Sequence, residues 1–562
     1  MYFPDEYWQS LEIAHRIVFG YGYRTWEWIG TPIRSIAHPA LFVPWYALLK
    51  WTGMDSSLTL LTIGPPIQQA LISAVGDWYA YRLILRIGGQ RVAQCWAVLH
   101  LLSFYWVYTA TRTFANTTEA ALCSITLYFW PLSPVLVTHT PMRTFRCALL
   151  AAFCAVLIRP TSLVLFAFLG LHTLYMAWRH AGVKRACILL ANALAVGLPV
   201  LASGVALDTL YYGQRIVTPY LFVRENLFKN LAVFYGRHPW HWYFTQGIPV
   251  LTTVLFPWSM IGWYKSLSGN VHPKWDAASL CTLAWLSLWT TCLYSFLSHK
   301  ELRFLQPLVP WFTLFAAVCL TRVHDSSQRQ NAWRALPKLV RGLLLIQLPL
   351  LVYAAAFHCT GQVQVMAYLH MLPPKQTVGF LMPCHSTPWQ SHMHARHLEM
   401  SEFDEELISG DTGRAWFLTC HPPRRTNART YWDQTDFFYE DPVRYMKSRF
   451  PDQYHMPPPP MKARHFRRRT QVGDAADPVA LHRHSDLGWR HPWPTHLVMF
   501  ASLLDERPRA CSLDAPCEDV RTFLKSRNYV ETRRFWNTLV HPEKERSGDV
   551  VVWSYKHPLR SY

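Results

Sequence analysis

Charged residues are scarce in this sequence. They make up 16% of 562 residues, whereas a soluble globular domain typically carries roughly 25%. Hydrophobic residues make up 51%, so the composition predicts an integral membrane protein. The mean hydropathy of +0.05 is too low for a chain that lies wholly in lipid, and long apolar runs must therefore coexist with a large polar part.

Metal-binding spacing and internal repeats are also missing. The 13 cysteines include no CxxC pair of the kind that binds zinc, so no metal site is predicted and most thiols are expected to be buried and free. No repeat of solenoid type is present. The net charge of +19 does not indicate nucleic-acid binding, because Lys and Arg mostly flank apolar runs or fall in one late stretch.

Apolar runs recur through the first two-thirds of the chain, at or near the length needed to cross a hydrocarbon core of about 30 Å. The ten predicted spans are Leu60–Leu85, Val92–Thr109, Ala120–Val137, Cys147–Ile158, Ser162–Trp178, Ile188–Ala206, Gly247–Tyr264, Ala277–Leu297, Phe304–Leu320 and Leu339–His358. They predict a transmembrane helical domain over residues 59–358. Pro39–Trp51 is shorter and is read as a re-entrant or interfacial helix within an opening segment of residues 1–58.

The loops between these spans differ in charge. Those rich in Lys and Arg are Gly88–Arg91, His139–Arg146, Arg179–Arg185, Lys265–Lys274 and Thr321–Lys338. The positive-inside rule places them in the cytosol. The opposite, lumenal side then receives the opening segment, Thr111–Glu119, Arg159–Thr161, Asp208–Gln246, His299–Arg303 and the tail. Every polar cluster that could take part in a reaction falls on that one side.

Residues 359–562 form a polar tail with strand-like pieces at Val378–Met382 and His496–Leu504, which predict a small α/β domain. Within it, Tyr454–Arg490 contains PPPP and a basic cluster and is expected to be a disordered insert. The tail holds Cys384, Cys420, Cys511 and Cys517, which could pair in an oxidising compartment. Their connectivity cannot be read from the sequence.

Two adjacent acids, Asp5 and Glu6, open the chain ahead of an amphipathic, aromatic-rich stretch. A carboxylate at a membrane surface can act as a general base if it reaches the attacking hydroxyl. The alternative is a solvated or N-capping acid at the start of a helix over Tyr7–Val18.

A second cluster, His299-Lys300-Glu301-Leu302-Arg303, stands at the end of a predicted span. Charges gathered at the lipid boundary are costly unless they are paired or functional. A Lys and an Arg there suit a phosphate whose lipid tail stays in the bilayer. The alternative is a set of snorkelling anchor residues.

Further candidates for substrate binding lie on the same predicted side: Arg112, Arg159, and His238, Trp240 and His241 of the run YGRHPWHWYF. Aromatic rings beside hydrogen-bonding groups are typical of sugar sites. Aromatic belts at membrane interfaces have the same composition, and packing or a belt is the alternative for the two histidines.

Seven strings, in order along the chain, carry a resemblance to a known family: DEYWQSLEIAHRIVFGYGYRTWEW, IRS, TRTFANTTE, IRPT, FYGRHPWHWYFTQG, SHKELRF and MPCHSTPWQSH. Together they resemble the glycosyltransferase family 22 mannosyltransferases. HKELRF marks the wider family. TWEW, HPWHWYF and MPCHSTP are similar to the branch that adds the third mannose of glycosylphosphatidylinositol (GPI) anchors.

The resemblance implies a GT-C type fold in the endoplasmic reticulum membrane. It implies inverting transfer of mannose from dolichyl-phosphate-mannose, in α-1,2 linkage, to the second mannose of the GPI precursor. In the family pattern Asp5 maps to the catalytic base with Glu6 as its neighbour. Lys300 and Arg303 would hold the donor phosphate, and His299 and Glu301 would orient them. No cofactor or sugar nucleotide is implied.

Two features depart from the family. Members begin with a transmembrane helix before the acid pair, whereas Met1 stands four residues ahead of Asp5, so upstream sequence is expected to encode about 20 apolar residues. The other departure is the basic, Pro-rich insert. The alternatives are another family 22 enzyme, acting on the fourth GPI mannose or the dolichol-linked N-glycan precursor, and a transporter or scramblase. Against the last, charged clusters lie at one face rather than at mid-depth.

Overall fold

The described residues of the computed structural model are 2–229, 231–321, 332–399, 414–422, 433–450, 492–506 and 518–556. Contacts divide the chain into two units. The helical unit comprises Pro32–Phe42 and Ile63–Val352, and the sheet unit comprises Met1–Thr31, Val43–Thr62 and Tyr353–Tyr562. The sequence prediction treats residues 1–58 and 359–562 as separate domains, whereas these contacts group most of the opening segment with the tail.

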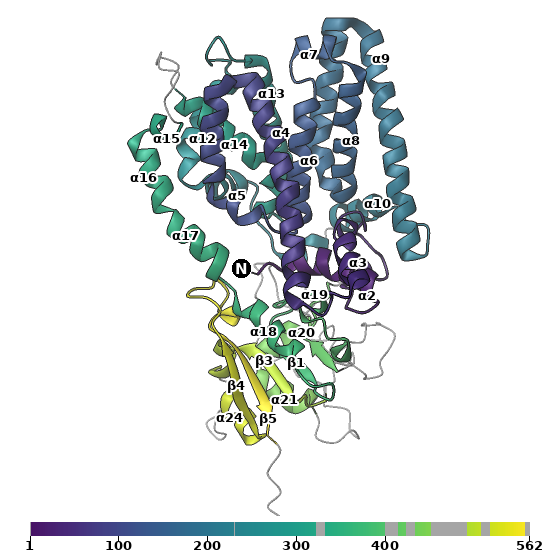
Figure 1. The fold of residues 1–562 in the computed structure, drawn as a ribbon, viewed down its shortest axis with the longest axis vertical. Coiled ribbons are helices and arrows are strands. Elements are labelled where there is room, and N and C mark those ends of the chain that lie inside the picture. Colours follow the sequence, from purple (N-terminus) through teal and green to yellow (C-terminus); the bar gives the residue numbers. More distant parts are fainter. Residues whose placement is uncertain are drawn as a thin grey trace, which may run out of the picture. The chain divides into compact units, whose positions relative to one another are not determined.

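Helices form almost all of the helical unit (Figure 1). They are α4 (Leu58–Leu101, begun in the sheet unit), α5 (Phe104–Thr109), α6 (Ala115–Phe129), α7 (Pro134–His139), α8 (Met142–Ile158), α9 (Leu163–Tyr212), α10 (Thr218–Val223), α11 (Ile248–Thr252), α12 (Phe256–Leu267), α13 (Ala277–Ser295), α14 (Val309–Leu320), α15 (Ala332–Ala335), α16 (Lys338–Ile346) and α17 (Leu348–Val352). Short turns of other helix types join them, among them η5 (Arg224–Phe228), η7 (Tyr243–Gly247) and η9 (Leu302–Leu308).

Six helical segments of the described chain are long and apolar enough to cross a membrane: Leu58–Leu101, Pro160–Tyr212, Tyr243–Leu267, Ala277–Ser295, Leu302–Leu320 and Lys338–His370. The first two each contain a glycine with positive φ, Gly89 at 77° and Gly182 at 82°. Glycine adopts this conformation without steric cost, so each segment has two arms, as the predicted span pairs require. The prediction of a polytopic α-helical protein is confirmed.

Two predicted spans are interrupted as helices. In Val92–Thr109, α4 ends at Leu101 and α5 begins at Phe104. The run Ala120–Val137 is interrupted because α6 ends at Phe129, just before Trp130-Pro131, and α7 starts anew at Pro134. Proline lacks the N–H that would continue the helix, and it restricts the residue before it. The short predicted span Cys147–Ile158 is instead longer in the structure, because α8 begins at Met142 and has 17 residues.

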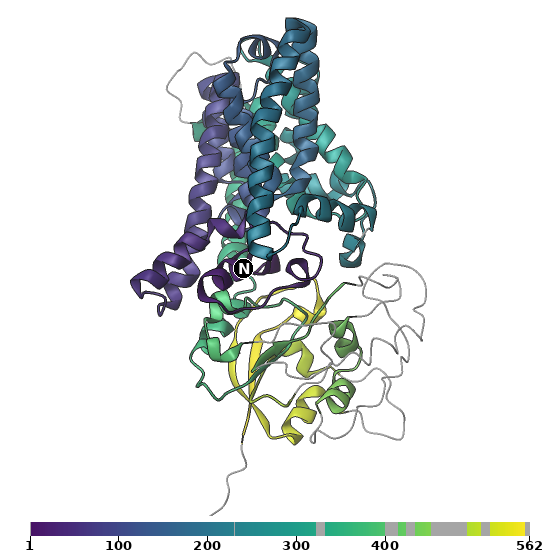
Figure 2. The same ribbon diagram turned by 90° about the vertical axis from the view of Figure 1, so that its right-hand side faces the viewer.

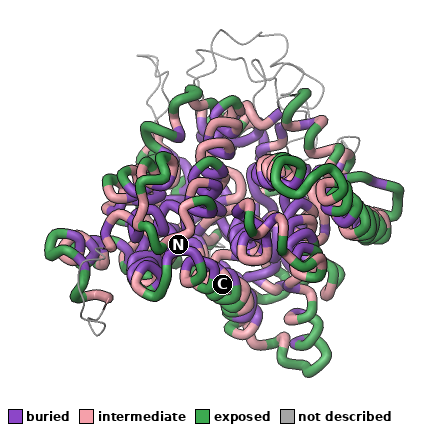
Figure 3. Tube along the Cα trace, turned by 90° about the horizontal axis from the view of Figure 1, so that it is seen from above, coloured by how far each residue is buried: buried purple, intermediate pink, exposed green. Residues whose placement is uncertain are grey.

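Small residues set the close packing of the helical unit. A side chain at Gly262 of α12 would collide with the Phe315 carbonyl of α14, and one at Gly197 of α9 would collide with the Phe153 ring of α8. Close backbone approach through glycine is typical of membrane helix pairs. Exposed residues follow the outer surfaces of the helices (Figure 3), including Leu171, Trp178 and Leu198 of α9, as expected for faces that meet lipid.

The sheet unit contains a five-stranded sheet in the order β2-β1-β3-β5-β4. Its strands are β1 (Val378–Leu381), β2 (Ala415–Phe417), β3 (His496–Phe500), β4 (Tyr529–Phe535) and β5 (Val550–Tyr555). The β2-β1-β3 part is parallel, and β5 pairs antiparallel with β3 and β4. Strands β1 and β3 are buried along their whole length, which explains why they are apolar except for His496 at the start of β3. The predicted α/β tail is confirmed.

Helices flank this sheet (Figure 2). They include α18 (Gly361–His370), α19 (Gln390–Met393), α20 (Gln434–Glu440), α21 (Pro442–Arg449), α23 (Ala501–Leu504) and α24 (Val520–Ser526). The predicted strand at His496–Leu504 therefore ends at Phe500, where α23 begins. The predicted insert Tyr454–Arg490 and the cysteines Cys511 and Cys517 lie outside the described residues.

The opening segment is a helical run of α1 (Pro4–Glu6), η1 (Tyr7–Leu11) and α2 (Glu12–Phe19), followed by α3 (Val43–Thr52). Gly20, with φ of 84°, ends α2 as a left-handed cap. The middle turn, η1, is a π-helix, a wide turn that is frequent at functional sites. Helix α2 packs against α19, which places the start of the chain beside the segment that follows β1.

Candidate active site

The cluster predicted around Glu301 is assembled in the helical unit, in the loop that follows α13 and the first turn of η9, which contains Arg303. Glu301 Oε1 lies 2.9 Å from His299 Nε2 and 2.8 Å from a terminal nitrogen of Arg303. The other ring nitrogen of His299 lies 3.0 Å from the carbonyl oxygen of Gly236. Glu301 therefore joins the imidazole and the guanidinium into one group.

The charge state of this group follows from its partners. Burial alone would raise the pKa of Glu301, but Arg303 and His299 outweigh it and hold that pKa well below its usual range. Burial opposes protonation of His299, yet its contacts with Glu301 raise its pKa overall. Both ring nitrogens face oxygen acceptors, and the imidazolium can donate to both. With Lys300 and Arg303 charged, the cluster carries a net positive charge.

Lys300 is 2% exposed. Its ammonium donates to the carbonyl oxygen of His238 at 3.0 Å and to that of Leu297. Burial, with Arg237 nearby, lowers its pKa. Two of its three N–H groups thus hold the backbone on either side of the cluster.

The predicted aromatic-His run meets this cluster through its backbone. Besides the contacts of Gly236 and His238 with His299 and Lys300, the His238 N–H donates to the carbonyl oxygen of Ser298 at 3.1 Å. The His238 ring stacks on Trp242 with centroids 4.5 Å apart. Trp240 is 68% exposed and His241, also exposed, lies 3.3 Å from the Thr245 hydroxyl. The structure therefore joins His238 to the charged cluster and turns Trp240 and His241 outward.

Arg159, predicted to bind substrate, lies in a buried polar network. Its Nε is 2.9 Å from Glu119 Oε2, and its guanidinium donates to Asn116 Oδ1 at 3.1 Å. Asn116 in turn donates to the backbone carbonyl of Arg303 at 2.9 Å. The network therefore connects Arg159 to the loop that carries Arg303. The Arg112 guanidinium lies 5.4 Å from the centre of the Tyr108 ring.

Breaking the buried pair should destabilise the protein. Arg159→Met leaves the Glu119 carboxylate, 2% exposed, without its cation, which typically costs about 3–5 kcal/mol. Thermal melting of the detergent-solubilised protein measures the effect, and adding Glu119→Gln should restore part of the loss. The control is Arg224→Met, because Glu225 keeps its contact with Lys229 at 3.0 Å and partly exposed pairs contribute about 0–1 kcal/mol. Equal melting shifts for the two single variants would contradict this role.

The acid pair lies in the sheet unit. Helix α1 has Phe3 as its N-cap residue, so Asp5 and Glu6 stand in the first turn rather than at the cap. Glu6 is buried and Asp5 is half-buried. Glu6 is also the N-cap residue of η1, where its side chain makes no cap hydrogen bond. Both acids belong to a different unit from the Glu301 cluster.

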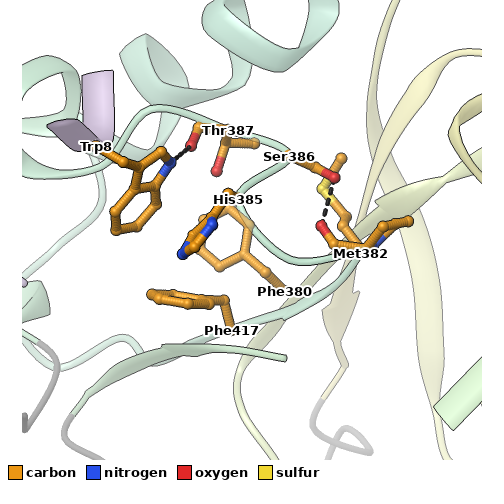
Figure 4. Close-up of a pocket in the computed structure, with 8 residues that line it drawn as sticks. Trp8, Phe380, Met382, His385, Ser386, Thr387 and Phe417 are labelled. Carbon is orange, nitrogen blue, oxygen red and sulfur yellow. Dashed lines mark hydrogen bonds between the residues drawn. The ribbon is translucent and has the colours of Figure 1, made fainter. Parts of the chain in front are cut away.

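Residues on either side of the acid pair bind the segment that follows β1. The Tyr2 hydroxyl donates to the carbonyl oxygens of His385 and Thr387, at 2.5 and 2.8 Å. The Trp8 indole donates to the same Thr387 oxygen at 3.1 Å, and its ring lies 4.6 Å from the His385 ring (Figure 4). The string MPCHSTP marks this segment in the sequence, but sequence reasoning assigned it no role.

Cys384 and Cys420 form a disulfide, which settles one pairing that the sequence left open. Cys384 stands in the chain between Pro383 and His385. These two residues line a small recess together with Trp8, Phe380, Met382, Ser386, Thr387 and Phe417 (Figure 4). Potential metal-ligand atoms of Cys384, His385 and Cys420 lie within 4.8 Å of one another. As a disulfide the two sulfurs offer no thiolate, so this cluster does not fit a metal ion.

Helices long and apolar enough to span a membrane, a largely half-buried charged cluster and a carboxylate pair on the α/β unit indicate an integral membrane enzyme. Residues 1–394 match the model of the Alg9-like mannosyltransferase family, and the chain belongs to this family of glycosyltransferases.

Similar proteins extend over almost the whole chain. A mouse relative named GPI alpha-1,2-mannosyltransferase 3 is 31% identical over 99% of this chain and 86% of its own length. A Yarrowia lipolytica relative named GPI mannosyltransferase 3 is 32% identical over 98% of this chain and 92% of its own. The fold is also similar to that of ArnT from Cupriavidus metallidurans bound to undecaprenyl phosphate, with 14% identity, a TM-score of 0.48, and coverage of 72% of this chain and 82% of that one.

Proposed function

We propose that this mannosyltransferase adds the third mannose of the GPI anchor precursor, in α-1,2 linkage to the second mannose, with dolichyl-phosphate-mannose as the donor. The observation that carries the proposal is the similarity over 99% of the chain to a relative named GPI alpha-1,2-mannosyltransferase 3. Two motifs that set this branch apart lie close to the residues assigned to the reaction. HPWHWYF contacts the Glu301 cluster, and MPCHSTP contacts the residues on either side of the acid pair. A GT-C type fold is part of the proposal.

The acid–base part of the reaction is assigned to the acid pair. Asp5 accepts the proton of the acceptor's 2-hydroxyl while that oxygen bonds to the anomeric carbon of the donor mannose. The bond from that carbon to the phosphate oxygen breaks with inversion, and dolichyl phosphate leaves with the electron pair. A positioned carboxylate supplies this kind of general-base assistance. Glu6 is assigned to orienting Asp5 or the acceptor.

The electrostatic part is assigned to the Glu301 cluster. A leaving phosphate develops negative charge, which fixed cations stabilise without reorganising. Arg303, aligned by Glu301, offers forked hydrogen bonds to phosphate oxygens. Lys300 has one N–H beyond the two that hold backbone carbonyls, and His299 keeps Glu301 in place. Arg159 acts from behind this loop through Asn116.

The proposed location is the endoplasmic reticulum membrane, with the acid pair and the Glu301 cluster on the lumenal side. The chain is a multi-pass membrane protein, and its most basic predicted loops lie between spans on the opposite face. Donor and acceptor would both be lipids of that membrane, so neither substrate needs to leave the bilayer.

Loss of the protein tests the function. Cells that lack it should accumulate a GPI intermediate carrying two mannoses, because the next acceptor is never made. Membranes that contain the protein should convert this intermediate to a three-mannose product with dolichyl-phosphate-mannose, and an α-1,2-specific mannosidase should remove the new sugar. Accumulation of a three-mannose GPI intermediate, or of a truncated dolichol-linked glycan, would instead assign the chain to another step of the same chemistry.

A further inference from the structure

Glu12 is a buried carboxylate that the proposed reaction does not use. It is 0% exposed, and burial raises its pKa to about 7. Its two oxygens accept the backbone N–H groups of Gln390 at 3.0 Å and Ser391 at 2.9 Å. A side chain at Gly22 would approach Oε1 to 2.9 Å, so the neighbouring loop is shaped around this carboxylate. Burying a carboxylate is costly unless hydrogen bonds compensate for its lost hydration.

The bonds of Glu12 complete a set that runs along the whole opening helix. Tyr2 lies before the acid pair and Trp8 after it. Tyr2 donates to the carbonyls of residues 385 and 387, and Trp8 donates to that of residue 387. Glu12, one further turn along, binds residues 390 and 391. Segment 384–391 therefore holds the helical run on both sides of Asp5 and Glu6, including the π-helical turn that directly follows them.

Segment 384–391 is itself fastened to the sheet unit. The disulfide joins its first residue to Cys420, which follows β2. Gln362 of α18 donates to the carbonyl oxygen of Ser386 at 2.7 Å. The position of the acid pair is thus set by residues far away in sequence and not by its own helix alone.

We propose that Glu12, through segment 384–391 and its disulfide, is a positioning residue that sets where the acid pair stands. The inference rests on the proposed function, because the proposed function assigns catalysis to the acid pair. Glu12 itself touches neither substrate. Its removal is expected to lower turnover by misplacing the base, since misplacement by about 1 Å can cost roughly 10²-fold.

The test combines Glu12→Gln with Asp5→Asn in the full chain. Glutamine keeps the size, but its NH₂ group faces a backbone N–H that the carboxylate accepted. We expect Glu12→Gln to lower kcat by about 10- to 100-fold with the donor KM unchanged, and to have no further effect once Asp5 is Asn. The matched control is Glu399→Gln, an exposed carboxylate of the same unit, which should leave kcat unchanged.

A second variant covers the case in which Glu12→Gln does not fold. Replacing both Cys384 and Cys420 by Ala loosens segment 384–391 without changing the helix, and should lower kcat with the same dependence on Asp5. Normal kcat in these variants, or a loss equally large in the Asp5→Asn background, would overturn the positioning role.

Amide hydrogen exchange separates this inference from the proposed function. Amide exchange in residues 2–12 should be faster in Glu12→Gln than in the wild type and in Glu399→Gln. This difference does not depend on which substrate the enzyme uses. Unchanged exchange would contradict the inference. A wild-type protein that transfers no mannose to the two-mannose acceptor would instead refute the function and leave the exchange result to decide the structural role.

Discussion

Asp5→Asn is expected to lower mannose transfer by about 10²–10⁴-fold, the usual range of general-base assistance. Asparagine keeps the size of the side chain but cannot take up the proton of the attacking hydroxyl. The measurement is the rate of transfer to the two-mannose GPI intermediate at saturating donor and acceptor and at matched protein levels. Because Asp5 is half-buried in the first turn of α1, the substitution should leave the fold intact.

Glu6→Gln is the matched comparison, since it makes the same chemical change at the adjacent, buried residue. Its effect should be smaller than that of Asp5→Asn. A well-folded Asp5→Asn protein with near-normal transfer would remove Asp5 from the mechanism. A deep loss in Glu6→Gln alone would move the base by one residue.

Arg303→Ala is expected to raise the donor concentration needed for half-maximal transfer by about 10- to 100-fold, with a much smaller effect on the acceptor. The substitution removes a charge-assisted hydrogen bond worth roughly 1.5–3 kcal/mol. Arg303→Lys should also impair donor use. A lysine lacks the forked pair of N–H groups that Glu301 aligns in the arginine. Varying each substrate in turn, while the other is held at saturation, separates the effect on the donor from the effect on the acceptor.

Lys300→Ala should weaken donor use as well, and it should also loosen the loop, because the Lys300 ammonium holds two backbone carbonyls. The cleaner measure of phosphate binding is therefore Arg303. Unchanged donor dependence in both Arg303 variants would leave the cluster as an interfacial anchor, the alternative that the sequence could not exclude.

The sequence predicts the helical elements well where an apolar run is long and uninterrupted, as in α13. It misplaces helix ends where a proline sits inside an apolar run, as at Pro131, because hydropathy averages over the residue that breaks the helix. Strands β1 and β3 could be predicted because a fully buried parallel strand is apolar throughout.

The charged cluster of residues 299–303 could be found because its members are neighbours in the chain. Glu12 could not, because its partners Gln390 and Ser391 follow it by more than 370 positions, and a lone acid in an amphipathic helix gives no sign of its depth. Likewise, four cysteines in the tail allow several pairings, and folding selects Cys384 with Cys420. The MPCHSTP motif could be recognised in the sequence as part of the family resemblance. Its contacts with the opening helical run are seen only in the hydrogen bonds of the structure.

The Cys384–Cys420 disulfide also orders events during synthesis of the chain. The acid pair is translated first, yet at about 5–20 residues per second Cys420 leaves the ribosome roughly 20–80 s later. By then the helices that carry Arg303 have already been made. Oxidation in a thiol-oxidising compartment must follow before segment 384–391 is fastened. If segment 384–391 positions the acid pair as proposed, the chain would gain its transferase activity only after this last unit has folded and the disulfide has formed.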